Sequence, residues 1–203
     1  MMKIIGLTGG IGAGKTTVSD YLKKKGYRIL DADRFAREIT LPGSPVLSRL
    51  AGAFGTSILL PDGSLDRKKL GAMAFASEEG KNELDRITHG EIKKRILDGI
   101  AQAGREGLTA VFVDAPLLFE AGLDRYTDMV WLVDADDRLR IERLKRRDGL
   151  TERELWDRIA RQLPREEKLQ RADVVLDNSK TEEELYLQIE QVLKRYVETE
   201  SDH

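Results

Sequence analysis

Short, unbroken apolar runs alternate along the chain with longer segments of helical periodicity. The apolar runs cover residues 4–8, 27–30, 110–113, 129–133 and 174–176. Continuous apolar strands are typical of a parallel sheet whose two faces are both covered by helices. The pattern therefore predicts an α/β fold with a parallel five-stranded sheet flanked by helices.

Helical patterns fill the gaps between these strands, over residues 16–25, 33–40, 84–103 and 181–198. The last of these starts with a capping-box pattern, Thr181 followed by Glu184. Residues 41–80 contain no strong strand pattern, and Pro-Gly and Pro-Asp-Gly turns separate short helical patches there. We therefore expect a helical insertion within the α/β core.

Four of the five predicted strands are followed by an aspartate: Asp31, Asp114, Asp134 and Asp177. Ligands of open α/β sheets bind beyond the carboxyl ends of the strands, so these carboxylates are candidates for one shared crevice. Aspartate also ends strands and caps helices. Each of the four is therefore equally compatible with a local structural role.

Composition and charge exclude several classes of protein. The 203 residues carry a net charge of −2, so there is no basic field for nucleic acid. The absence of cysteine excludes thiolate metal sites and a cysteine nucleophile, and two histidines are too few for a multi-histidine site. No apolar run has the length of a membrane span, and the start lacks a signal-peptide pattern. We expect a cytoplasmic protein with no membrane partner.

The strongest motif is a phosphate-binding loop (P-loop), which matches G-x-x-x-x-G-K-[ST] in full between a predicted strand and a predicted helix. Its backbone N–H groups and the helix N-terminus favour phosphate. Lys15 is expected to bridge the β- and γ-phosphates of ATP, and Thr16 to ligate Mg²⁺. Asp114 is either a second metal ligand or only a strand-end residue. The expected ATP-binding residues of the loop are Gly9, Gly10, Ile11, Gly12, Ala13, Gly14, Lys15, Thr16 and Thr17.

A phosphate loop does not by itself distinguish a kinase from a GTP switch or a motor. The chain has no N-K-x-D motif, and no D-x-x-G follows the third predicted strand. Its length is also small for a motor. A small-molecule kinase needs a group facing the acceptor hydroxyl and cations that close over the phosphates. Both are present as candidates, while a nucleotide-dependent regulatory protein stays open as an alternative.

The acceptor-facing candidates are Asp31 and Asp33. On an extended segment, residues i and i+2 share a face, so the spacing allows either carboxylate to orient or deprotonate a hydroxyl. The structural alternative is that Asp31 ends the strand and Asp33 caps the next helix. The spacing does not decide between them.

The candidate cations lie in residues 138–171, which hold 12 Lys/Arg against 7 Asp/Glu. Arg140, Arg143 and Arg147 are spaced i, i+3, i+7 and so share one helical stripe, and Arg161 and Arg165 add further charge. This pattern predicts a lid over bound phosphates, with a solvated basic helix as the alternative.

Taken together, these motifs resemble the bacterial dephospho-coenzyme A kinases. The matching segments are residues 7–17, 31–33, 114–120, 143–148 and 172–178, of which Pro116-Leu117-Leu118-Phe119-Glu120 and Ala172–Asn178 are the most specific. The resemblance implies transfer of the ATP γ-phosphate to the 3′-hydroxyl of dephospho-CoA, the last step of coenzyme A biosynthesis. It also implies a single P-loop kinase domain. Its core would cover residues 1–40, 104–137 and 172–203, with a helical CoA-binding region at 41–103 and a lid at 138–171.

The same resemblance implies roles for individual residues. Asp33 is the expected base on the 3′-hydroxyl, Arg143 and Arg147 the expected phosphate contacts, and Asn178 the expected neighbour of adenine. Expected substrate contacts are His89, Leu117 and Arg140. A nucleoside or nucleotide acceptor is the alternative substrate, and a monomer or a small homo-oligomer is equally compatible with the sequence.

Two positions depart from the family pattern. The chain has Thr88-His89-Gly90 where the family commonly has Thr-His-Pro before its central helix. Glycine lacks the preset conformation of proline, so we expect a looser start of that helix. Arg140 stands where the family often has glutamine.

Overall fold

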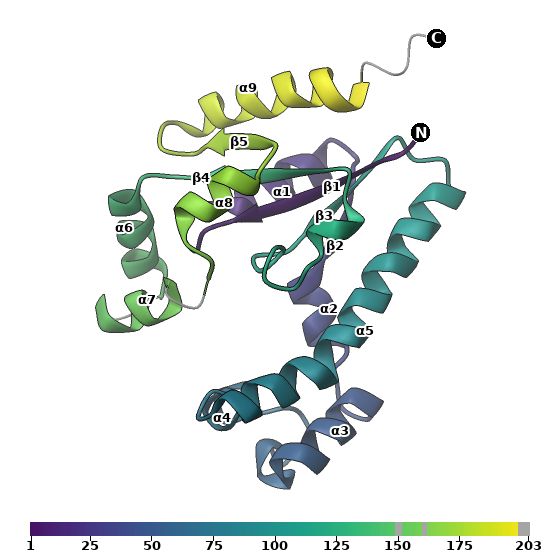
Figure 1. The fold of residues 1–203 in the computed structure, drawn as a ribbon, viewed down its shortest axis with the longest axis vertical. Helices are drawn as coiled ribbons and strands as arrows, with labels where there is room; N and C mark the ends of the chain where they lie inside the picture. The colour runs from purple at the N-terminus through teal and green to yellow at the C-terminus, as the bar shows by residue number, and fades with distance from the viewer. Residues whose placement is uncertain (149–151, 160–161, 199–203) are drawn as a thin grey trace. The chain divides into compact units, whose positions relative to one another are not determined.

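The computed structural model describes residues 1–148, 152–159 and 162–198. In this part of the chain the strands form a five-stranded sheet of order β2-β3-β1-β4-β5 (Figure 1). The central strand β1 (Lys3–Gly9) pairs in parallel with β3 (Ala110–Asp114) and β4 (Met129–Asp134). β4 also pairs in parallel with β5 (Val174–Asp177), and β2 (Arg28–Asp31) forms the other edge. The expected parallel sheet is confirmed.

The helices follow the order that the periodicity predicts. They are α1 (Lys15–Lys24), α2 (Ala32–Glu38), α3 (Pro45–Phe54), α4 (Arg67–Ala74), α5 (Glu78–Arg105), α6 (Asp137–Asp148), α7 (Glu152–Ile159), α8 (Arg165–Arg171) and α9 (Glu182–Leu193). Short 3₁₀ turns occur at Thr56–Ile58 and Asp124–Tyr126, and α9 continues as a π-helical turn at Lys194–Glu198. The capping box predicted for α9 is present.

One face of the sheet packs against α1 and α9. Phe112 of β3 and Trp131 of β4 are fully buried there, with ring centroids 5.2 Å apart in an edge-to-face arrangement. Leu22 of α1 and Ile189 of α9 complete the same core cluster. Burying each large apolar side chain stabilises the fold by roughly 1.5–3 kcal/mol. This packing gives the loop between β1 and α1 a rigid base.

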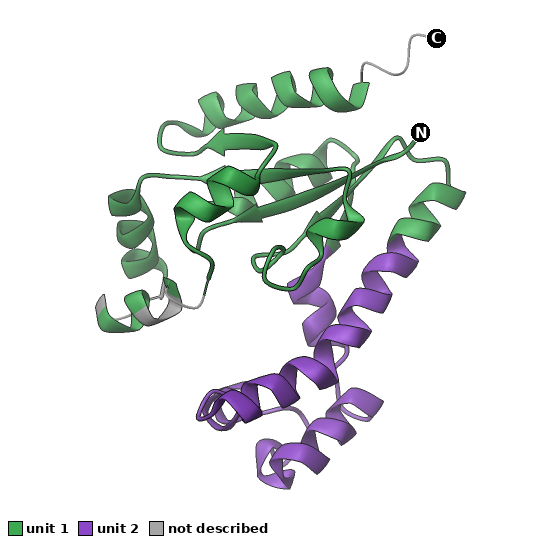
Figure 2. Ribbon diagram, in the orientation of Figure 1, with its two compact units in different colours: residues 1–30, 100–203 green, residues 31–99 purple. Residues whose placement is uncertain are grey.

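Two compact units make up the chain (Figure 2). The first unit comprises residues 1–30 and 100–203 and contains most of the sheet, while the second comprises residues 31–99. The second unit has its own core, which includes Ile39, Leu50 and Ile58. Helices α3 and α4 confirm the helical insertion expected at 41–80. The assignment of residues 41–103 to CoA binding and of 138–171 to a lid stays a prediction.

The start of α5 differs from the expectation. The helix begins at Glu78 rather than near residue 84, because Ser77 caps it: the Gly80 amide donates to Ser77 Oγ at 3.0 Å. Thr88-His89-Gly90 therefore lies inside the helix, and the expectation of a loosened helix start at Gly90 was wrong. No helix among the described residues is long and apolar enough to cross a membrane.

Candidate functional site

The phosphate loop joins the central strand β1 to α1 within the first unit. Gly14, the last residue before α1, has φ of 91° and ψ of 26°, a left-handed conformation that favours glycine. Gly14 has no side chain, so no side-chain cap occupies the first-turn N–H groups of α1. The positive end of the α1 dipole is therefore presented to an anion, as the motif predicts.

Lys15 and Asp114 meet at the carboxyl edge of the sheet. Asp114 is the last residue of β3 and pairs in register with Leu7 of β1, which brings it to the start of the loop. The Lys15 ammonium forms an ion pair and hydrogen bond with Asp114 Oδ1, and the Asp114 side chain is only 4% exposed. A buried carboxylate thus holds the lysine of the P-loop motif at the strand ends.

The residues predicted to hold Mg²⁺ are Thr16 and Asp114. Among the described residues no group of three or more His, Cys, Asp or Glu side chains could enclose a metal ion. Mg²⁺ usually takes only one or two protein oxygens and fills its octahedron with water and phosphate oxygens. The exposed Thr16, adjacent to Lys15, and the Asp114 carboxylate supply hard oxygen donors of this kind, so the donor set fits Mg²⁺ bound with a nucleotide.

Asn178 ties the loop to the end of β5. Its buried side-chain amide donates to the Ala13 carbonyl at 2.8 Å, and its backbone amide donates to the Asp134 carbonyl at 2.8 Å. Arg143 of α6 donates to the Asn178 carbonyl at 3.0 Å. The second terminal nitrogen of Arg143, NH1, is buried without a hydrogen-bond partner among the described residues. The structure thus brings the predicted adenine neighbour and one predicted lid arginine to the same loop.

Arg140 also contacts the loop: its side chain binds the loop backbone at Ile11. Its side chain is 7% exposed, its Nε donates to the Ile11 carbonyl at 3.0 Å, and its NH1 donates to Asp137 Oδ1 at 2.9 Å. The Ile11 amide in turn donates to Gln162 Oε1 at 3.0 Å. Arg147, the last of the three stripe arginines, is exposed, and Arg161 lies outside the described residues.

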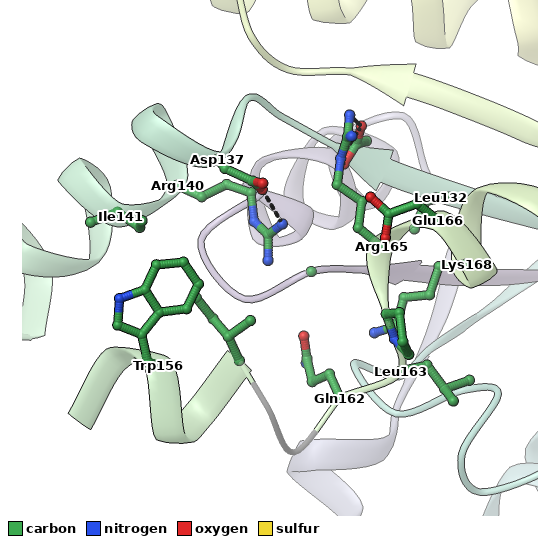
Figure 3. A pocket seen from close by; sticks show the side chains of 14 residues that line it. Leu132, Asp137, Arg140, Ile141, Trp156, Gln162, Leu163, Arg165, Glu166 and Lys168 are labelled. Atoms are coloured by element: carbon green, nitrogen blue, oxygen red, sulfur yellow. Dashed lines mark hydrogen bonds and ion pairs between the residues drawn. The ribbon is translucent and has the colours of Figure 1, made fainter. Parts of the chain in front are cut away.

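A cavity of about 380 Å³ lies beside the loop within the first unit (Figure 3). Gly10, Arg140 and Gln162 line it, and Trp156 of α7 faces Arg140 across it. Arg165 binds Asp134 with Nε–Oδ1 at 2.9 Å and NH2–Oδ2 at 2.5 Å. The hydrogen bonds that Arg165 donates to the Asp134 carboxylate raise the pKa of the Arg165 guanidinium.

Lys168 is the most buried cation of this cavity. Its side chain is 3% exposed, and its ammonium lies 3.4 Å from Glu120 Oε1. Burial lowers the pKa of Lys168, and the Glu120 carboxylate opposes that shift. Sequence reasoning did not assign roles to Gln162, Lys168 or Glu120. The only signal was that Glu120 ends the specific segment Pro116–Glu120.

Leu117 lies in that same segment. It is 44% exposed, whereas its neighbour Leu118 is fully buried against Gly6 of β1. An exposed leucine beside the buried end of β3 is compatible with the predicted substrate contact.

Asp31 and Asp33 belong to the second unit, and their predicted geometry was wrong. The chain turns from extended to helical directly after Asp31: Asp31 is the N-cap of α2, its Oδ1 accepting from the Arg34 amide at 3.0 Å, so Asp33 lies in the first helical turn. Asp33 is exposed. The helix-capping role therefore belongs to Asp31 and not to Asp33.

His89 lies on the exposed surface of α5, also in the second unit. Its Nε2 is 3.2 Å from Asp85 Oδ1, one helical turn earlier. This pair holds the imidazole at the helix surface, and its predicted role at the substrate stays a prediction.

Comparison with known proteins identifies relatives along nearly the whole chain. The family model described as dephospho-CoA kinase matches residues 3–184. A dephospho-CoA kinase of Corynebacterium glutamicum is 47% identical over 189 residues, which cover 93% of this chain and 94% of the relative. One of Geobacter metallireducens is 43% identical over 197 residues, covering 97% of this chain and 98% of the relative.

Solved structures show the same fold. A dephospho-CoA kinase of Campylobacter jejuni has a TM-score of 0.74 at 26% identity, covering 98% of this chain and 99% of that one. A shikimate kinase of Acinetobacter baumannii shares the fold alone, with a TM-score of 0.54 at 16% identity over 100% of this chain and 97% of its own.

Proposed function

The chain belongs to the dephospho-CoA kinase family and is an ATP-dependent kinase of dephospho-CoA, and we propose that its residues divide the reaction as follows. The Gly12–Thr17 amides and Lys15 bind the ATP phosphates, and Asn178 lies against the adenine. The observation that carries this assignment is the ion pair between Lys15 and Asp114 beside the uncapped N-terminus of α1. Phosphoryl transfer depends mainly on such positioning and charge neutralisation.

Asp33 is the proposed base on the 3′-hydroxyl of dephospho-CoA. The competing carboxylate, Asp31, already accepts the Arg34 amide as a helix cap. Asp33 lies in the first turn of α2 and is exposed. In this role it accepts the proton of the attacking hydroxyl and aligns the oxygen with the γ-phosphorus.

Thr16 and Asp114 are the proposed protein ligands of Mg²⁺, which when bound neutralises charge on the β- and γ-phosphates. Lys15 adds a second positive charge, and Asp114 holds it in place. Arg143 and Arg147 on α6 are the proposed cations that close over the transferring phosphoryl group. Closing them over the site also excludes water, which would otherwise hydrolyse ATP.

His89 and Leu117 are proposed contacts to dephospho-CoA. The proposed place of action is the cytoplasm, where ATP is available.

The experiment that tests this function is ADP release with ATP and Mg²⁺, with and without dephospho-CoA. We expect release to depend on dephospho-CoA and the product mass to match coenzyme A. A panel of nucleosides and nucleotides is run in parallel. Equal release without any acceptor, or a faster rate with a nucleoside, would contradict the assignment of the substrate.

A further inference from the structure

Ile11 is held on both sides of its backbone by side chains from distant parts of the sequence. Its amide donates to Gln162 Oε1 at 3.0 Å, across 151 residues, and its carbonyl accepts Arg140 Nε at 3.0 Å, across 129 residues. Ile11 directly precedes the Gly12–Thr17 segment. The two contacts therefore fix the peptide planes from which that segment starts.

Gln162 is itself anchored by the residues that follow it. The next amide, that of Leu163, donates to Glu120 Oε1 at 2.8 Å. Arg165 makes its paired bonds to Asp134, and Lys168 makes its ion pair with Glu120. These contacts attach residues 162–168 to the loop after β3 and to the end of β4, so Gln162 presents its oxygen to Ile11 from a fixed backbone.

Arg140 reaches the loop from α6 and is equally constrained. Asp137 holds its NH1, and the guanidinium passes so close to Gly10 that a Cβ there would lie 2.6 Å from NH2. Gly10 thus leaves room for the side chain that binds Ile11. The contact lies in the first unit, and its two side chains, Arg140 and Gln162, line the cavity shown in Figure 3.

We propose that Gln162 and Arg140 are positioning residues for ATP: they clamp the Ile11 peptide and so keep the Gly12–Thr17 amides directed at the phosphates. Neither residue needs to touch ATP in this role. The inference rests on the proposed function insofar as it takes those amides as the phosphate-binding groups. An amide aimed by such a clamp binds phosphate without first losing conformational freedom, which is the benefit of a preorganised site.

The test compares Gln162→Met and Gln162→Asn with the control Gln102→Met. Methionine keeps the length but replaces the amide oxygen with a thioether sulfur, which is only a weak acceptor for the Ile11 amide, and asparagine keeps the amide but is one methylene too short. Gln102 is an exposed residue of α5 whose amide donates to Glu106, so its loss leaves Ile11 untouched. The affinities for ATP and for adenosine are measured, with the thermal midpoint of the unliganded protein.

We expect both Gln162 variants to bind ATP about ten-fold more weakly, the loss that one hydrogen bond to a fixed peptide typically represents. Adenosine, which has no phosphates, should bind as it does to the control, and the thermal midpoint should also equal that of the control. Unchanged ATP affinity overturns the proposal. An equal loss for ATP and adenosine, or a loss that follows a lowered midpoint, also overturns it in favour of a purely structural role.

A second arm tests whether the two residues act through the same peptide. Arg140→Met is combined with Gln162→Met, and the loss of ATP affinity in the double variant should be smaller than the product of the single losses. Full multiplication of the losses contradicts a shared clamp. Coenzyme A formation by the wild type and by Gln102→Met is followed separately. Its absence would refute the proposed function, while the ATP-affinity comparison would still decide the role of the clamp.

Discussion

The side-chain amide of Asn178 donates to the carbonyl oxygen of Ala13 at 2.8 Å, although 165 residues separate the two. The bond is buried and connects the last strand of the sheet to the phosphate loop beside the first strand. A Cβ on Gly14 would overlap with the amide nitrogen that makes this bond. The absence of a side chain at Gly14 therefore leaves the space that Asn178 needs to reach the Ala13 carbonyl.

Replacing Asn178 with alanine should destabilise the protein and weaken ATP binding. The Ala13 carbonyl would lose its side-chain donor, at a cost of about 1–3 kcal/mol in the free energy of unfolding. Urea denaturation and ATP titration measure the two effects, with Asn82→Ala on the exposed surface of α5 as the control. Identical unfolding curves for the two variants would show that the bond contributes nothing.

Asn substitutions should separate the two carboxylates at the start of α2. Asp33→Asn removes the proposed base and should lower kcat by about 10²–10⁴, with little change in ATP affinity. Asp31→Asn keeps a good helix cap, so turnover should stay near that of the wild type. Steady-state kinetics with dephospho-CoA measure both. Near-normal turnover of Asp33→Asn would refute its assignment.

Lys168→Met should destabilise the first unit through the carboxylate that it leaves behind. Without the ammonium, Glu120 loses the partner 3.4 Å away, and because its side chain is 19% exposed the cost should stay below the roughly 3–5 kcal/mol of a fully buried ion pair. Adding Glu120→Gln should restore much of the loss, because glutamine can still accept the Leu163 amide. Chemical denaturation of Lys168→Met and of the double variant measures this coupling. Equal stabilities of these two variants would show that the Glu120 carboxylate does not cause the loss.

Glu190 of α9 should make stability depend on acid pH. The Tyr21 hydroxyl, at 2.6 Å, and the Lys25 ammonium bond to its carboxylate and hold its pKa below the ordinary 4.5. A lowered pKa in the folded state adds stability above the ordinary value, and this contribution is lost as pH falls through the folded pKa. Thus the stability difference between wild type and Glu190→Gln should shrink as the pH falls from 4.5 through the lower pKa that Glu190 has in the folded state.

Unfolding of the wild type and of Glu190→Gln across the acid range checks this dependence. Tyr21→Phe provides a second comparison, because it removes the hydroxyl that contributes most to the shift. A stability difference that stays constant with pH would show that the carboxylate does not contribute through its charge.

The sheet and the phosphate loop were predictable because both depend on local sequence. Strands buried on both faces leave continuous apolar runs, and the loop has a fixed spacing of glycines, lysine and threonine. Of the strand-end aspartates, Asp114 and Asp134 hold cations at the site, whereas Asp31 and Asp177 accept backbone amides nearby. The sequence could not separate these roles, because the cation partners of Asp114 and Asp134 lie 99 and 31 residues away along the chain.

The errors arose where capping competes with periodicity. Asp31 caps α2, so the helix begins at the next residue, Ala32. Asp33 is therefore helical and not extended as expected. Ser77 starts α5 before its apolar pattern becomes visible. The contact between Gln162 and Ile11 had no sequence signal, because Gln162 is a single polar residue in a basic segment and its partner is a backbone amide.

The supports of the phosphate loop also impose an order on its assembly during protein synthesis. The loop is made well before the side chains that hold Ile11 and Ala13, which follow their partners by 129, 151 and 165 residues along the chain. A nascent chain therefore carries the complete nucleotide motif long before it carries the groups that shape it. A chain that stops before residue 178 is therefore expected to lack these supports and to bind nucleotide more weakly.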